Sequence, residues 1–148
     1  MAANTQPIFP ITQNVGHAVV TTQDLSFTAP TVVSTVLTAG ANGSRIDGMK
    51  IRALGTNVAT VLRIFIKDGS TSFTLVYELA VAATTAGTAA ITGVDTELIP
   101  INLDNMGSST ASGCGVLPPY LKAGQSLCVT VGTTVAAGYA VTVFGGDY

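Results

Sequence analysis

Two stretches of alternating apolar and polar residues flank a predicted turn near the middle of the chain. Residues 61–67 and 71–81 place an apolar side chain at about every second position, and the sequence KDGS at 67–70 separates them. An Asp-Gly pair supplies the positive φ angles that a two-residue hairpin turn needs. The pattern therefore predicts a β-hairpin in which Ile64 lies opposite Phe73 and Leu62 lies opposite Leu75.

The predicted register gives this hairpin one apolar face and one mixed face, because residues opposite each other in an antiparallel pair project to the same side. The apolar face would carry Leu62, Ile64, Ile66, Phe73, Leu75, Tyr77 and Leu79. The mixed face would carry the interface candidates Val61, Arg63, Phe65 and Val76. A solvated face is mostly polar, so we expect another layer of the protein or another subunit to cover these apolar side chains.

Further strands are predicted from short apolar or β-branched runs bounded by turn residues, at 17–22, 31–38, 44–54, 95–102, 126–132 and 139–144. In the run at 44–54, Ile46 is out of phase with Met49 and Ile51, which predicts a β-bulge at Gly48. Turn signals at intervals of roughly 8–12 residues are typical of a sandwich or barrel. We predict an all-β fold: a single-domain antiparallel β-sandwich, jelly-roll-like, with about eight strands.

The amino-terminal segment differs from the rest of the chain. Residues 1–12 are polar, contain two prolines and predict an extended arm that crosses a surface. We expect Ile8, Phe9 and Ile11 to anchor this arm on a neighbouring subunit. The predicted organisation is an arm with a first short strand at 1–27, followed by a sandwich domain at 28–148.

Composition favours a protein that packs against other subunits. Of 148 residues, 47% are hydrophobic and only 9% are charged, whereas an ordinary soluble domain has roughly 25% charged residues. No apolar stretch approaches the ~18–20 residues of a membrane-spanning helix. The net charge of −2 argues against nucleic-acid binding. The first ten residues lack the features of a signal peptide, so we expect assembly in a cytoplasm.

The candidates for chemistry are few, and for each the structural interpretation is favoured over the functional one. His17 is the only histidine and has no nucleophile motif beside it. Asp95 and Glu97 would share a strand face, either as a solvated edge or as a carboxylate or calcium pair. Asp104, with Asn102 and Asn105 beside it, has faint calcium-loop character. We therefore predict no enzymatic activity, no cofactor and no metal.

The two cysteines, Cys114 and Cys128, leave two interpretations open. A reduced pair fits a cytoplasmic origin, and a disulfide formed after release from a cell is the alternative. The glycine-rich sequence around Cys114 precedes no helix, so it is not a phosphate-binding loop.

Five of the six basic residues fall between positions 45 and 67; they are Arg45, Lys50, Arg52, Arg63 and Lys67. They are either solvated outward positions or contacts to an acidic partner surface, and the sequence favours neither. Lys50, Arg63, Phe65 and Lys67 could also suggest an oligonucleotide-binding face. Asp68 and Glu78 balance that charge, so we expect no nucleic-acid partner.

Three stretches together resemble small virion proteins encoded by tailed bacteriophages. They are RIDGMKIRALGT at 45–56, the segment 61–81 with its IKDG turn, and the carboxyl end LPPYLKAGQSLCVTVG…GYAVTVFGGDY. The resemblance covers residues 44–148 and leaves the arm outside. The chain departs from it in Pro118-Pro119, the two cysteines and the long loop at 82–93.

The resemblance implies a capsid decoration or cement protein: a β-sandwich, often a homotrimer, that caps the lattice of the major capsid protein on the virion exterior. A neck or tail structural protein is an alternative within the same class. A carbohydrate-binding β-sandwich is an alternative from a different class. For a carbohydrate-binding site, Tyr120 and Tyr148 are the only plausible exposed aromatic residues.

Overall fold

The computed structural model describes residues 9–69, 71–85, 96–98 and 120–148. These residues form strands connected by turns and loops, and no helix occurs among them. The strands are β1 (Thr12–Val20), β2 (Ser34–Thr38), β3 (Ser44–Ala53), β4 (Thr60–Asp68), β5 (Ser72–Val81), β6 (Thr96–Leu98), β7 (Tyr120–Leu121), β8 (Gln125–Val131) and β9 (Tyr139–Asp147).

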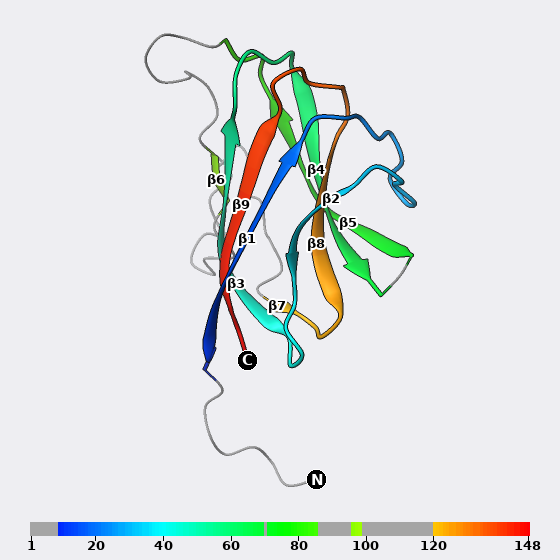
Figure 1. The fold of residues 1–148 in the computed structure, drawn as a ribbon. Coiled ribbons are helices and arrows are strands. Elements are labelled where there is room, and N and C mark those ends of the chain that lie inside the picture. The colour runs from blue at the N-terminus through cyan, green and yellow to red at the C-terminus, as the bar shows by residue number, and fades with distance from the viewer. Residues whose placement is uncertain (1–8, 70, 86–95, 99–119) are drawn as a thin grey trace, which may run out of the picture.

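The strands form two antiparallel sheets that face each other (Figure 1). The first sheet has the order β1-β9-β3-β6, with the short β7 also paired to β3. The second sheet has the order β2-β8-β4-β5. The predicted all-β, sandwich-like fold class is therefore confirmed.

One edge of the sandwich is closed where β1 meets β2, which lie side by side in Figure 1. Ser34 Oγ donates to the carbonyl of Val19 at 3.1 Å, and Asn14 Nδ2 donates to the carbonyl of Thr38. The backbones approach so closely that a Cβ on Gly16 would lie 2.1 Å from the carbonyl oxygen of Val36. Glycine at this position is thus a requirement of the closed edge.

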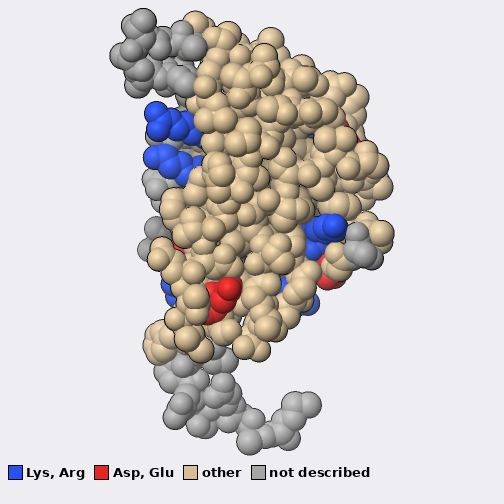
Figure 2. Space-filling model, in the orientation of Figure 1, with Lys and Arg blue, Asp and Glu red and all other residues tan. Residues whose placement is uncertain are grey.

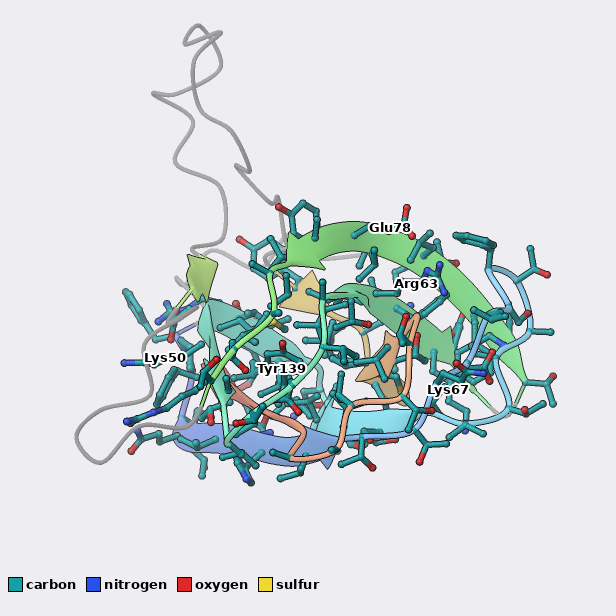
Figure 3. The ribbon with its side chains drawn as sticks, turned by 90° about the horizontal axis from the view of Figure 1, so that it is seen from above. Lys50, Arg63, Lys67, Glu78 and Tyr139 are labelled. Atoms are coloured by element: carbon teal, nitrogen blue, oxygen red, sulfur yellow. The ribbon has the colours of Figure 1, made fainter. Side chains whose placement is uncertain are left out.

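The core lies between the sheets and follows the two-residue period of the strands. In β8, for example, Leu127, Val129 and Val131 point inward. The other fully buried members come mainly from β3, β4 and β9: Met49, Ile51, Ala53, Leu62, Ile64, Tyr139 and Val143. Figure 3 shows Tyr139 between the two sheets.

The hairpin exists, but its predicted two-residue turn is wrong. Asp68 pairs with Ser72, so three residues and not two separate the strands. Gly69 has the expected positive φ, 61°. Three-residue loops also use a glycine in this conformation, which is why an Asp-Gly pair alone does not fix the loop length.

The longer turn changes which side chains share a face. Near the turn, Phe73 lies opposite Lys67 and Leu75 lies opposite Phe65, so the predicted placement of Phe73 and Leu75 on the core face is wrong. A β-bulge opposite Ile64 then shifts the register by one residue. Beyond it the prediction holds, since Tyr77 and Leu79 pack against the core.

Other strand boundaries also shifted. The bulge at Gly48 is confirmed, because the pairing of β3 with β9 slips between Ile46 and Gly48. Strand β1 begins at Thr12, five residues before the predicted start at 17, and it pairs with β9 along its whole length. The predicted strand at 95–102 lies mostly outside the described residues. Only its part at 96–98 is described, and that part forms β6. Strand β7 was not predicted.

Candidate functional site

The outer face of the first sheet is an open surface built by three strands. Val15 lies opposite Phe144, and Val19 lies opposite Ala140. The side chains of Val15, Val19 and Phe144 are 49%, 45% and 43% exposed. Gly48, the neighbour of Phe144 on β3, leaves open space beside that ring, because a Cβ there would contact nothing within 4 Å.

Basic side chains border this apolar surface on β3. Lys50 and Arg52 lie in register with Thr142 and Ala140 of β9, and both are exposed. In Figure 3 Lys50 points away from the core. Figure 2 shows that charged side chains are sparse on the face in view, with Lys and Arg atoms at the left edge beside the first sheet. The outer face of the first sheet therefore carries exposed apolar side chains at Val15, Phe144 and Val19, with the polar pair of His17 and Thr142 between them and positive charge along one side.

His17 lies on this outer face, and its Nδ1 is 3.2 Å from the hydroxyl of Thr142. A catalytic hydroxyl–histidine pair also needs a group that orients the histidine. No carboxylate of the described residues hydrogen-bonds to His17. The pair is therefore an exposed cross-strand contact in this arrangement.

The outer face of the second sheet is covered by the chain itself. Residues 24–32, here called the covering segment, pass over Arg63 of β4. The Arg63 guanidinium donates to the carbonyl of Asp24 at 3.0 Å and to Glu78 at 2.8 Å, and it stacks on the ring of Phe27 at 4.3 Å. Arg63 is consequently only 8% exposed. Figure 3 shows Arg63 and Glu78 together on this sheet.

The carboxylate of Asp24 organises the covering segment. It accepts backbone N–H groups from Ser26 at 2.9 Å, Thr31 at 2.6 Å and Val32 at 2.8 Å. These bonds, led by the one from Val32, lower the pKa of Asp24, and burial opposes them. The segment is thus held by an ionised carboxylate at neutral pH.

Phe65 and Cys128 lie opposite each other on the outer face of the second sheet, and neither is exposed. The ring of Phe73 meets that of Phe65 edge-on, with centroids 6.2 Å apart. Burial raises the pKa of the Cys128 thiol, and a hydrogen bond with Thr35 opposes this shift. A protonated, buried thiol is unreactive. Cys114 lies outside the described residues, so the two cysteine interpretations stay open.

The predicted interface residues occupy different environments. Phe9 and Ile11 are 70% and 86% exposed, and Ile8 lies outside the described residues. Arg63 and Phe65 are buried within the chain. Val61 is half-buried, and Val76 packs against the core because it belongs to the bulge in β5. Of the two covers expected for the mixed face of the hairpin, the structure shows another layer of the same chain over Arg63.

The remaining candidates for chemistry gather into no site among the described residues. Arg45 pairs with its neighbour Asp47 at 2.6 Å, and Lys67 lies 5.7 Å from the centroid of the Phe73 ring. Asp95, Asn102, Asp104 and Asn105 lie outside the described part of the chain, and Glu97 falls in β6. Within that part, no cluster of His, Cys, Asp or Glu is suited to a metal ion, and no helix could cross a membrane.

A buried polar cluster closes one loop region and has a structural role. Asn57 Oδ1 accepts the backbone N–H groups of Ala137 and Gly138, both at 2.9 Å, and its Nδ2 donates back to the Gly138 carbonyl. Thr84 donates to the carbonyl of Gly55 at 2.7 Å. Burial raises the pKa of the neighbouring Tyr139 hydroxyl. Asn57 and Thr84 hold backbone groups, and all three side chains are buried and not accessible to a substrate.

A pocket of about 670 Å³ lies where β1 begins and β9 ends, and its described walls are Ile11, Asn42, Tyr120 and Tyr148. The two tyrosines are those that the sequence offers as exposed aromatic residues. Tyr120 is 60% exposed.

Comparison with protein-family models, curated proteins and solved structures finds no match to this chain. Its candidate sites therefore rest on the geometry above. Sequence reasoning missed the surface of Val15, Val19 and Phe144, since β1 and β9 lie at opposite ends of the chain. The available signal was the alternation of Val15, His17 and Val19, because it starts before residue 17, where the predicted strand begins. This alternation could have predicted the longer β1.

Proposed function

We propose that this chain is a structural virion protein of a tailed bacteriophage, in the class of capsid decoration or cement proteins. The partner would be the major capsid protein on the virion exterior, and the chain would assemble as a homo-oligomer, with a trimer favoured. The resemblance of residues 44–148 to small phage virion proteins supports this proposal.

The observation that carries the proposal is the outer face of the first sheet. Exposed apolar side chains that gather on one face can mark an interaction site. Val15 and Phe144 lie opposite each other and are exposed, and Val19 is exposed on the same face beyond His17. The cores of protein interfaces are apolar and depleted in charge. Because only 9% of the residues are charged, this chain has little of the charge that keeps soluble monomers apart.

We also propose that the sandwich is a jelly roll preceded by an arm. The sheets have the strand orders β1-β9-β3-β6 and β2-β8-β4-β5, so strands that follow each other in the sequence alternate between the sheets over much of the chain. This alternation supports the jelly roll. Jelly rolls occur in viral capsid domains and in lectins. The exposure of Phe9 and Ile11, just before β1, supports an arm that docks on a neighbour.

The test is to locate the chain in purified particles of its source phage. We expect mass spectrometry to find it in constant proportion to the major capsid protein, and antibody labelling in electron micrographs to mark the heads. Labelling of the neck or tail would favour the alternative structural role. Absence of the chain from purified particles would refute a virion function.

A further inference from the structure

We propose that the pocket between Tyr120 and Tyr148 binds a neutral pyranose ring. Its volume of about 670 Å³ lies within the range of small-molecule sites, roughly 300–1,000 Å³. Its described walls combine one aliphatic side chain, two tyrosines and one amide. This proposal does not rest on a virion function. The pocket shares Ile11 with the proposed arm contact, so its test uses the two tyrosines.

The walls of the pocket are held in place by backbone hydrogen bonds. Ile11 N donates to the carbonyl of Asp147 at 2.7 Å, and Tyr148 N donates to the carbonyl of Gly43 at 3.2 Å. Gly43 has φ 93°, and a Cβ there would lie 2.7 Å from the carbonyl oxygen of Leu121. Only glycine suits this turn, and the side chain of the preceding Asn42 is held by its hydrogen bond to the backbone oxygen of Tyr148. A preformed site loses less entropy when a ligand binds.

The side chains in the walls match the two kinds of surface on a sugar ring. A tyrosine offers an apolar ring face and a polar hydroxyl, and the C–H face of a pyranose can stack on such a ring. Asn42 Nδ2 donates one hydrogen bond to the carbonyl of Tyr148 at 3.1 Å. An amide has a second N–H and a carbonyl oxygen, which suit adjacent sugar hydroxyls.

The charges beside the pocket favour a neutral ligand over an anion. Arg45 lies opposite Tyr120 in the pairing of β3 with β7. Its guanidinium is already engaged by Asp47, with Nε–Oδ1 at 2.6 Å and Nη2–Oδ2 at 3.2 Å. A phosphate or carboxylate would have to compete with that ion pair, whereas a hydroxyl-rich neutral ring would not. The phosphate of a nucleotide is disfavoured for the same reason, which leaves a neutral nucleoside as the competing class.

The experiment is a titration of the ¹⁵N-labelled full chain with methyl glucoside, methyl mannoside, methyl galactoside and N-acetylglucosamine, with uridine as the competing ligand class. We expect at least one sugar to cause saturable shifts of the Asn42 side-chain amide and of the Tyr120 and Tyr148 backbone amides. Tyr120→Ala should weaken this binding at least about tenfold, and Tyr120→Phe should retain most of it. Phe144→Ala, which removes an exposed aromatic ring outside the pocket, should leave it unchanged.

Tyr148→Ala is the second test variant should Tyr120→Ala fail to fold, as judged from its amide spectrum. A parallel arm measures retention on a polysaccharide built from the sugar that binds. Retention that the free sugar competes away identifies a glycan surface as the source, and binding of the free sugar alone identifies a soluble ligand. The proposal is overturned if no sugar causes saturable shifts, if uridine alone binds, or if binding survives both tyrosine substitutions.

Discussion

The two outer faces of the sandwich differ in what covers them. On the second sheet, Arg63 and Phe65 are buried, and the covering segment of the same chain packs over Arg63. On the first sheet, Val15 and Phe144 are about half exposed, and no described segment packs over them. The sequence pattern placed interface candidates on the second sheet, with another layer of the protein as the alternative cover, whereas the described residues leave the first sheet open. An apolar outward position therefore indicates that something covers it, but not which chain supplies the cover.

The covering segment explains the difference. Asp24 N donates to the carbonyl of Val131, which attaches the segment to the second sheet. The Asp24 carboxylate and Arg63 then fix its path. The covering segment, held by the buried charges of its own Asp24 and of Arg63 on β4, thus covers part of this sheet. The first sheet has no such loop among the described residues.

The sharpest test of this comparison applies the same change to both faces. Phe65→Ala should lower the free energy of unfolding by about 3–5 kcal/mol, as for other buried aromatic residues. Phe144→Ala should lower it by much less, about 1 kcal/mol, because this side chain is already about half exposed. Denaturant unfolding of the two variants and the parent measures both. Equal losses would mean that the two faces are equally buried in solution.

A second matched pair tests the charges. Arg63→Ala removes hydrogen bonds to Asp24 and Glu78 and the packing on Phe27, and we expect a loss of about 2–3 kcal/mol. Amide exchange at Thr31 and Val32, in the covering segment, should accelerate. Arg52→Ala, at an exposed position on the first sheet, should change stability by less than about 0.5 kcal/mol. Unchanged exchange in the covering segment would show that Arg63 does not hold it.

The sequence predicts strands better than it predicts how they pair. Alternation correctly placed Leu62 and Ile64 in the core, and the slipped phase of Ile46 correctly predicted a bulge. The loop length of the hairpin was not predictable, since Gly69 suits loops of two or three residues. The open face depends on pairs such as Val15 with Phe144. These two residues are far apart in the sequence, so no local pattern shows that they pair.

The third prediction concerns association, and it depends on the proposed virion function. Val19→Asp combined with Phe144→Asp places charge on the outer face of the first sheet and should weaken binding to particles at least about tenfold. Cosedimentation of the purified chain with particles measures this, and thermal unfolding should show little change. Ala80→Asp, at an exposed position on the outer face of β5 opposite Val61, is the matched control and should bind normally. Loss of binding by the control alone would place the interface on the second sheet.

The smallest expected effect comes from Asp24, and its sign depends on pH. Asp24→Asn keeps one acceptor oxygen but replaces the other with a donor that faces backbone N–H groups, so we expect a loss of about 1 kcal/mol at pH 7.

The folded protein holds the pKa of Asp24 below its ordinary value of 3.8. The carboxylate therefore contributes its full stabilisation above about pH 5, and this contribution is lost as the pH falls through the folded pKa. The pKa of Asp147 is also lowered, chiefly by a hydrogen bond from Ser44, but it titrates in both proteins and cancels in the difference. Unfolding free energies of parent and variant, measured from pH 7 downward, should converge in acid. A difference that stays constant with pH would show that the ionised carboxylate does not hold the covering segment.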